Sequence, residues 1–432
     1  TTSEVVRALT PEFGADAGIG VIGPAGEFKL LGAGIANTDG DQEASRFCAR
    51  GGLGAVMGAK GLKCIVVPNT GQGYREPADP HGWKAAVREY NRLLTTLPST
   101  SKFFPELGTA GTLEKVNSLG GLPTRNFSAG EFEAADNLSG WYMREVILER
   151  DGEGTTTHAC MPGCVIRCSN RYPDTSGQLH VSPMEYETNT LMGSNLGIGD
   201  LDVVAELNRL CNEYGLDTIE IGAALGVAME AGLIEFGDAE GAIGLVHEIG
   251  QGTVLGRVIG SGAAVTGQVL GVSRVPVVKR QALPAYDPRG IKGNGVTYIT
   301  SPMGADHTAG NAIALKTDHL DPAGKVQASK DLQIRTAVMD SLGTCAFIRE
   351  LYFAHPDAVV ALVNALYGTD LTNEDLLRLG RKVIADELEF NRRAGLAAVD
   401  RLPEFFYTEP LPPHKEVFDV DPVELARIWE EA

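Results

Sequence analysis

The sequence predicts an α+β protein in which a strand-rich beginning is followed by two largely helical regions. Three observations support this fold class. Over residues 16–66, short apolar runs alternate with glycine, which is typical of short strands joined by tight turns. Over residues 200–270 and again over 371–393, apolar residues recur at intervals of three and four, which is typical of amphipathic helices.

The strand-rich beginning contains three apolar runs that we expect to form strands, because each is short and bounded by glycine or polar residues. They are Gly18–Gly23, Phe28–Ala33 and Cys64–Val67. The segment 69–80, with several Gly, Pro and polar residues, is typical of a linker. We therefore expect the helical part of the chain to begin after residue 80.

Local signals predict where several helices begin and end. Trp83–Leu94 has helical apolar spacing, and a helix that begins near residue 201 should end at Gly215, where glycine tolerates a left-handed conformation. The expected caps are Asp79, Thr218 and the pair Thr372 with Asp375. The sequence contains no internal repeat and no low-complexity tract.

Composition excludes several classes of protein. The 432 residues include 37 Lys and Arg against 56 Asp and Glu, a formal net charge of −19. A protein that neutralises nucleic-acid phosphates needs a basic face, so we expect no nucleic-acid partner. No apolar run reaches the roughly 20 residues of a membrane span, and no signal peptide is evident. The sequence therefore predicts a soluble, cytoplasmic protein without membrane insertion.

Three cysteines crowd into nine residues: Cys160, Cys164 and Cys168. On one continuous helix they would span about 12 Å, too far apart for one compact metal site. The helix-breaking pair Pro162–Gly163 lets the segment loop, so that the sulfurs can converge. Cys345 is the leading candidate for a fourth ligand. We expect the other cysteines, Cys48, Cys64 and Cys211, to be free core residues.

Three interpretations of the cysteine group remain open. A cubane iron–sulfur cluster takes four Cys ligands and fits the group best. A structural zinc site is the first alternative, although such sites usually combine paired short-spaced motifs that this sequence lacks. Buried thiols without any ligand are the second alternative. The odd total of seven cysteines does not resemble a secreted disulfide framework.

Four stretches together resemble the tungsten-dependent aldehyde:ferredoxin oxidoreductases, and the similarity runs over nearly the whole chain. They are Arg50–Lys60 with the following Leu62-Lys63, Glu185–Thr188, Pro284–Gly290 and Asp340–Cys345. The resemblance implies a tungsten ion held by two molybdopterins, with a [4Fe-4S] cluster beside it. The family's cluster motif is Cys-x-x-Cys-x-x-x-Cys, and its first position is Thr157 here. Cys160 and Cys164 match its second and third positions. Cys168 is inferred to replace the missing ligand, and Cys345 matches the family's fourth cluster ligand.

The resemblance also implies a division into domains. Residues 1–68 correspond to the C-terminal part of the pterin-binding base domain, so that part of this domain is expected to be lacking. Residues 69–275 correspond to a helical domain with the cluster cysteines and the first pterin motif. Residues 276–432 correspond to a helical domain with the second pterin motif and the fourth cysteine.

Each pterin of the family is bound by a motif Asp-x-x-Gly-Leu-Asp or Asp-x-x-Gly-Leu-Cys. The second motif is matched by 340–345, with Thr in place of Leu, and the first by 212–217, with Asn in place of the first Asp. The residues assigned to the pterins are therefore Asn212, Leu216, Asp217, Asp340 and Thr344. The glycine-rich stretch assigns pterin-phosphate contacts to Arg50, Gly51, Gly52 and Leu53, because Arg and exposed backbone N–H groups bind phosphate. Ordinary helix ends and a tight turn between strands are the alternatives for these stretches.

The family's proton-handling Glu and His correspond to Glu185 or Glu187 and to His307. If the Glu185–Glu187 segment is extended, both carboxylates point to the same face and the sequence cannot choose between them. A histidine is suited to acid–base work near neutral pH, although a structural role is the alternative. Glu206 and His247 match a mononuclear iron between subunits in some relatives, the alternative being two exposed helix residues.

The resemblance implies oxidation of aldehydes to carboxylic acids, with electrons passing to ferredoxin or an iron–sulfur partner subunit. It also implies a homo- or hetero-oligomer, and magnesium as a further cofactor, whose family contacts lie in the part of the base domain expected to be lacking. Two alternatives remain open: a non-catalytic iron–sulfur electron-transfer subunit, and a related tungsten enzyme that acts on acyl-CoA or aromatic acid substrates.

Overall fold

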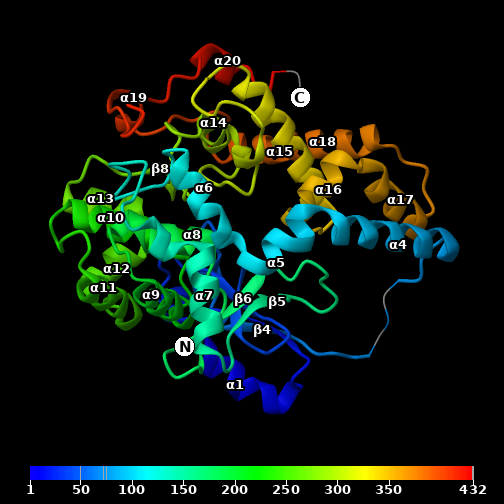
Figure 1. Cartoon of the computed structure of the whole chain (residues 1–432), viewed down its shortest axis with the longest axis horizontal. Helices are drawn as coiled ribbons and strands as arrows, with labels where there is room; N and C mark the ends of the chain where they lie inside the picture. The colour runs from blue at the N-terminus through cyan, green and yellow to red at the C-terminus, as the bar shows by residue number, and fades with distance from the viewer. Residues whose placement is uncertain (49, 72, 74, 431–432) are drawn as a thin grey trace.

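In the computed structural model, which describes residues 1–430 except 49, 72 and 74, strands gather near the N-terminus and helices make up most of the remainder. Figure 1 shows the N-terminal helix α1 (Thr2–Phe13) at the bottom, helices α9 to α13 on the left, and the C-terminal helices at the top and right. The predicted α+β fold class is confirmed.

A four-stranded antiparallel sheet forms the strand-rich beginning, in the order β3-β2-β1-β4. Its strands are β1 (Gly18–Val21), β2 (Ile35–Thr38), β3 (Ala44–Cys48) and β4 (Cys64–Val67). Helix α1 packs on one face of the sheet, where Val6 meets Ile19 and Val21 in a small core. On the other face, Ile65 and Val67 of β4 are exposed, since alternate side chains of a strand point in opposite directions.

Two expectations for this region are wrong. Phe28–Ala33 is not a strand: the helical turn α2 (Pro24–Glu27) precedes it, and the N–H groups of Phe28 and Leu30 donate to local carbonyl groups of residues 24 and 25. The sheet instead uses the more polar strands β2 and β3, which lack a clear apolar signal. Cys48, expected in the core, is exposed at the end of β3.

A second sheet, of three antiparallel strands, lies within the region expected to be helical. It comprises β5 (Thr155–His158), β6 (Ser169–Pro173) and β7 (Leu179–Val181), in that order. The loop between β5 and β6 carries the three crowded cysteines, so this sheet fixes both ends of that loop. A two-stranded ribbon, β8 (Val277–Val278) with β9 (Gln281–Ala282), follows later.

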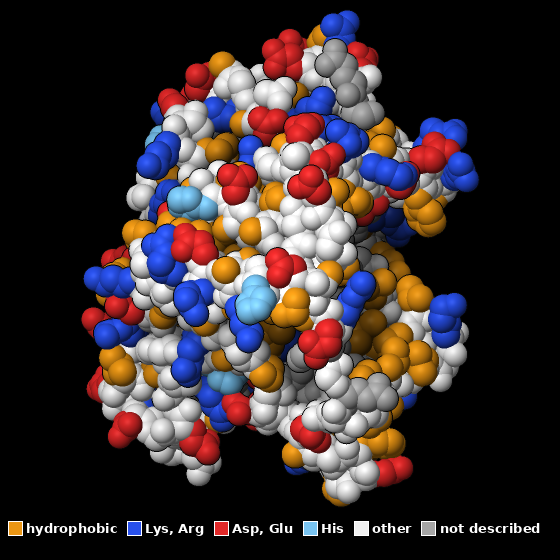
Figure 2. Space-filling view, turned by 90° about the vertical axis from the view of Figure 1, so that its right-hand side faces the viewer, with side chains coloured by type: hydrophobic (Ala, Val, Ile, Leu, Met, Phe, Trp, Pro, Cys, Tyr) orange, Lys and Arg blue, Asp and Glu red, His pale blue; other side chains and the backbone are white. Residues whose placement is uncertain are grey.

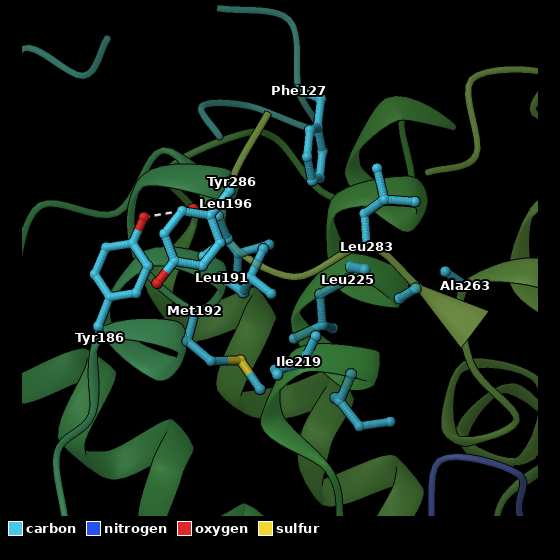
Figure 3. Close-up of a cluster of buried hydrophobic side chains, with 14 of the residues drawn as sticks. Phe127, Tyr186, Leu191, Met192, Leu196, Ile219, Leu225, Ala263, Leu283 and Tyr286 are labelled. Atoms are coloured by element: carbon cyan, nitrogen blue, oxygen red, sulfur yellow. Dashed lines mark hydrogen bonds between the residues drawn. The ribbon is translucent and has the colours of Figure 1, made fainter. Parts of the chain in front are cut away.

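The helices on the left of Figure 1 surround the main hydrophobic core. They are α9 (Leu201–Tyr214), α10 (Thr218–Glu230), α11 (Ala239–Gln251), α12 (Val254–Gly260) and α13 (Ala263–Leu270). Gly215 ends α9 in a left-handed conformation, as predicted. The cap of α10 is Asp217 rather than Thr218, because the Asp217 carboxylate accepts the Ile219 N–H. In Figure 3, Leu191 and Met192 lie close to Ile219 and Leu225 of α10 within this core.

The remaining helices lie at the right and top of Figure 1 and around the main core. Their bounds are α3 (Leu53–Ala59), α4 (Pro80–Thr96), α5 (Phe104–Leu107), α6 (Leu113–Ser118), α7 (Gly140–Arg150), α8 (Tyr186–Leu191), α14 (Lys292–Thr300), α15 (Lys325–Ser341), α16 (Arg349–Ala354), α17 (Pro356–Tyr367), α18 (Asn373–Arg393), α19 (Phe405–Thr408) and α20 (Pro422–Ala426). The predicted caps of α4 and α18 are present, at Asp79 and at Thr372 with Asp375.

Helix α4 packs with the C-terminal helices rather than with the helices that follow it in sequence. Leu93 and Leu94 of α4 share a second core with Val338 of α15 and Val359 of α17. Cys164 and Cys168 pack against this core, so the cysteine loop lies beside it. No helix in the described ranges is long and apolar enough to cross a membrane. Figure 2 shows hydrophobic side chains gathered in a hollow at the right-hand edge of that view.

Glycine permits an unusually close contact between α2 and α3. A Cβ atom built on Gly58 would lie 1.8 Å from the carbonyl oxygen of Gly26, so no side chain fits there. We expect Gly58→Ala to lower the free energy of unfolding by about 1–3 kcal/mol, because the backbone of α2 would have to move. Denaturant titration of both proteins measures this difference.

Gly244 on α11 provides a matched control for that substitution. It also lies within a helix, but it is exposed, and a Cβ atom there would have no neighbour within 4 Å. Gly244→Ala should therefore raise the stability by about 0.5–1 kcal/mol, through the lower backbone entropy of the unfolded chain. Equal effects of the two substitutions would contradict the contact between the two backbones.

Candidate active site

The loop 159–168 brings the three crowded cysteines together with Cys345. A bridge between His158 and Cys168 closes the loop, and Gly163 reverses its direction with φ +82°. Cys345 approaches from beyond the end of α15, where its sulfur accepts the Phe347 N–H at 3.4 Å. The sulfur of Cys164 accepts the Arg167 N–H at 3.5 Å. Hydrogen bonds of this kind stabilise thiolates that ligate iron.

The electrostatics of the four cysteines show that they are neighbours. Burial raises the pKa of the Cys160, Cys168 and Cys345 thiols, and the charges of the neighbouring cysteines and of Glu185 raise them further. In the part of the chain that the structure describes, no three of the four sulfurs lie within 4.8 Å of one another. A single zinc ion at about 2.3 Å from each sulfur would hold them within about 4 Å, whereas a four-iron cube holds its ligands further apart. The sulfurs thus do not have the spacing of ligands to a single zinc ion, and the iron–sulfur cluster stays a prediction.

Helix α8 separates the two candidate glutamates. Glu185 is the residue before its first turn, and Glu187 lies within that turn, so the two carboxylates do not share one face as they would in a strand. Glu185 accepts a hydrogen bond from the Thr109 hydroxyl, and its charge acts on Cys160, Cys168 and Cys345. This division could not be predicted from the sequence, because no local signal indicated where the helix begins.

Glu187 instead faces His307. One carboxylate oxygen of Glu187 accepts the Ala285 N–H at 2.8 Å, and the other lies 3.3 Å from His307 Nδ1. This second Glu187 oxygen and His307 Nδ1 are both buried, and neither has a hydrogen-bond partner of good geometry among the described residues. Burial raises the pKa of the Glu187 carboxyl, although the charge of His307 opposes this shift. The two atoms thus lie close together without a hydrogen bond of good geometry between them.

Aromatic side chains enclose this pair. The ring of Tyr286 lies 5.5 Å from that of His307 and 5.0 Å from that of Tyr186. Figure 3 shows Tyr186 and Tyr286 side by side, with the Tyr186 hydroxyl in a hydrogen bond, which it donates to the carbonyl of Ala285. Such walls exclude water and strengthen the electrostatic interactions between the groups inside.

Arg50 lies at the meeting point of three segments. Its Nε donates to Asp217 at 2.9 Å, and Nη1 donates to the carbonyl of Ala305 at 2.8 Å. Nη2 donates to the carbonyl of Ala282 at 2.9 Å and to Glu220 at 3.4 Å. Its guanidinium donors thus already face protein acceptors. Gly51 and Gly52 have φ of +87° and +75° and lead into α3, which begins at Leu53.

The residues assigned to the two pterins lie in unequal surroundings. Asp217 is bound to Arg50 and to the start of α10, and Leu216 is buried. Asn212 is near the end of α9, and its amide lies 3.5 Å from the carbonyl of Ser182. In the other motif, Asp340 is exposed in the last turn of α15, and the Thr344 hydroxyl donates to the carbonyl of Met339 at 2.9 Å. The assignments to pterins stay predictions.

The two candidate iron ligands each have another partner. Glu206 lies 3.2 Å from His180 Nε2 and 2.7 Å from Arg209, and hydrogen bonds from these two groups lower its pKa to about 2 although burial opposes the shift. His247 Nδ1 lies 2.9 Å from the Tyr214 hydroxyl. Over the described residues the structure records no contact between Glu206 and His247, and an iron shared between subunits stays a prediction.

Several residues of this region escaped the sequence analysis. Thr109, Glu220 and Arg349 belong to none of the motifs identified in the sequence, and their partners lie far away in the chain. A helical spacing of three from Asp217 would have pointed to Glu220, and a spacing of four from Cys345 would have pointed to Arg349. Thr109 carried no comparable signal.

Comparisons with known proteins agree with this architecture. The family profile "Aldehyde ferredoxin oxidoreductase, N-terminal domain" matches residues 1–69, and "Aldehyde ferredoxin oxidoreductase, domains 2 & 3" matches residues 85–429. The tungsten-containing aldehyde ferredoxin oxidoreductases of Pyrococcus horikoshii and Pyrococcus furiosus are 34% and 35% identical to this chain. Each alignment covers 95% of the chain and 69% of the relative.

A less similar protein sequence and a solved structure also match the chain. The aliphatic sulfonate oxidoreductase, WOR-like subunit, of Pyrococcus furiosus is 25% identical over 84% of the chain and 57% of that protein. The structure of the active site complex BamBC of benzoyl coenzyme A reductase, in complex with 1,5 dienoyl-CoA, is similar with a TM-score of 0.71. It is 17% identical over 99% of this chain and 72% of the other, which shows a shared fold alone.

The fold and the matching profiles define an oxidoreductase enzyme, as predicted. The chain belongs to the aldehyde ferredoxin oxidoreductase family. The break between the two profiles, at residues 70–84, overlaps the linker that the sequence predicts over residues 69–80. The three predicted domain ranges stay predictions.

Proposed function

We propose that this chain oxidises aldehydes to carboxylic acids at a tungsten–bispterin centre and passes the electrons through a [4Fe-4S] cluster to ferredoxin or a partner subunit. The proposal rests on the positions of two glutamates at the start of α8. The charge of Glu185 acts there on Cys160, Cys168 and Cys345, and Glu187, two residues later, faces His307. A one-electron path and a proton-handling pair thus lie on neighbouring residues, as this reaction requires. The tungsten-containing relatives support the choice of metal.

The proposed cofactors have definite protein ligands. Cys160, Cys164, Cys168 and Cys345 would hold the cluster. Two pterins, with magnesium at their phosphates, would lie at 212–217 and 340–345, and near the backbone of Gly51 and Gly52. When bound, the tungsten–bispterin group supplies a two-electron acceptor for the aldehyde.

The residues of the chain would handle the protons of the reaction. Aldehyde and water together give the acid, two protons and two electrons. The free Glu187 oxygen can accept a proton from the attacking water, and His307 can hydrogen-bond the oxygen of the aldehyde. Tyr286 and Tyr186 would keep further water out of the site.

The pH dependence of turnover tests the role of Glu187. A base must be ionised to accept a proton, and burial raises the pKa of this carboxyl above the ordinary glutamate value of 4.5. We therefore expect kcat/KM to fall about tenfold per pH unit as the pH drops below that raised pKa. Glu187→Gln should have a low rate without this acidic limb. An unchanged limb in the variant would assign it to another group.

Metal and substrate analysis of the purified holoenzyme tests the function as a whole. We expect tungsten and iron by elemental analysis, together with aldehyde-dependent reduction of ferredoxin. A non-catalytic electron-transfer subunit would contain iron and sulfide but no tungsten, and would oxidise no aldehyde. An enzyme for acyl-CoA or aromatic acids would contain tungsten and turn over those compounds instead. Gel filtration tests the proposed oligomer.

A further inference from the structure

Arg349, the first residue of α16, differs from the other largely buried arginines of the site and core. Arg50 is paired with Asp217 at 2.9 Å, and Arg289 is paired with Asp287 at 2.7 Å. Over the described part of the chain, no carboxylate oxygen lies within 4.0 Å of the Arg349 guanidinium, and its buried Nε has no hydrogen-bond acceptor. Its one recorded hydrogen bond runs from Nη1 to the carbonyl of Asn311, at 3.3 Å.

A partly buried guanidinium with a buried Nε and no ion partner is unfavourable. Burial lowers the pKa of Arg349, yet an arginine does not lose its proton in a protein, so the charge remains. A buried charge is normally compensated by an ion partner with hydrogen bonds. The charge of Asp340 acts on Arg349 from a distance but does not contact it. An anion from outside the described protein atoms would supply such a partner.

The position of Arg349 places this anion in the proposed active site. Tyr286 is an electrostatic neighbour of Arg349, and its ring lies 5.5 Å from the ring of His307. Asn311, which accepts the hydrogen bond from Arg349, follows His307 by four residues. Cys345 precedes Arg349 by four residues in the chain. Arg349 is thus connected through Asn311 and Tyr286 to the surroundings of His307, and in the chain it follows Cys345 by about one helical turn.

We propose that Arg349 is a binding residue for an oxyanion, either the carboxylate of the acid product or a phosphate of the cofactor. The planar guanidinium offers parallel N–H groups that match both a carboxylate and a phosphate. The choice between these two sources rests on the proposed function. The existence of an anion site rests on the unpaired guanidinium itself.

Two readouts on purified holoenzyme separate the sources, and neither requires turnover. Calorimetric titration with propionate measures carboxylate binding, with the uncharged propionamide as the ligand control. Pterin content per chain, from the fluorescence of the oxidised pterin, measures cofactor retention. The variants are Arg349→Met and Arg349→Lys. Arg335→Met is the matched control, because Arg335 on α15 packs over the ring of Phe353, outside the site.

If the anion is the product, Arg349→Met should bind propionate about 10- to 100-fold more weakly and keep its pterin. Arg349→Lys retains the positive charge but lacks the parallel N–H groups of the guanidinium. Its affinity for propionate should therefore lie between that of Arg349→Met and that of the wild type. If the anion is the cofactor phosphate, Arg349→Met should lose pterin while Arg335→Met keeps it. Propionate affinity within twofold of wild type, together with full pterin content, in both Arg349 variants would overturn the proposal. A wild-type protein that binds propionate through Arg349 but oxidises no aldehyde would refute the proposed function and leave the anion site intact.

Discussion

His307→Ala should lower both kcat and kcat/KM for aldehyde oxidation by about 10²–10⁴-fold. The imidazole is expected to act mainly in the transition state, so the two constants should fall together. Its Nδ1 lies 3.3 Å from the free oxygen of Glu187, so the substitution also leaves that carboxylate without its neighbour. Steady-state kinetics, with tungsten and iron measured in the same preparation, check this result.

The control for this substitution is His319→Ala. His319 is also buried, but its recorded contact is a backbone one, in which its carbonyl accepts the Lys292 N–H. Removing it should leave the turnover of folded enzyme within about a few-fold of wild type. Near-normal turnover in a metal-replete His307→Ala protein would make the histidine structural and leave the proton chemistry to the glutamates.

Cys168→Ser should abolish the iron–sulfur cluster and with it the reduction of ferredoxin. Three thiolates cannot complete a cube that takes four, and a serine hydroxyl is a poor substitute for a soft thiolate ligand. We expect iron and acid-labile sulfide to fall from about four each per chain towards zero, with loss of the visible absorption of the cluster. Iron and sulfide assays with an absorption spectrum measure this.

Cys211→Ser is the matched control for the cluster. Cys211 is buried on α9, within the main core, as the sequence predicted for a free cysteine. Its substitution should cost some stability but leave the iron and sulfide content unchanged. A full cluster in Cys168→Ser would show that another residue, not Cys168, completes the set of four ligands.

The parts of the fold that were predicted correctly depend on signals within a few residues. Asp79 and the pair Thr372 with Asp375 cap their helices through hydrogen bonds to backbone groups two or three residues away. Gly215 ends α9 because it alone can take the left-handed conformation there at no cost. Strand β3 was missed because its five residues include serine and arginine, and its pairing with β2 comes from the fold rather than from a local pattern.

Only those residues of the candidate site that belong to a motif could be predicted from the sequence. The cysteines and His307 were identified by motif, and the structure gathers the cysteines around one region. The choice between Glu185 and Glu187 depended on where α8 begins, and the partners of Arg50 lie at least 167 residues away in the chain. Asp340 is exposed, whereas Asp217 forms an ion pair with Arg50, and this difference likewise results from tertiary packing.

The contacts of Arg50 also have a consequence for how the protein unfolds. This side chain belongs to the N-terminal segment, but its acceptors belong to α10, to β9 and to the residues just before His307. If the sheet separated from the helices, the buried Arg50 cation would lose its partners, and the carboxylates of Asp217 and Glu220 would lose the cation. Unpaired charges of this kind are costly in a low-dielectric interior. The two parts should therefore melt in a single cooperative transition, and ligands bound near His307 should protect the amide hydrogens of the distant sheet from exchange.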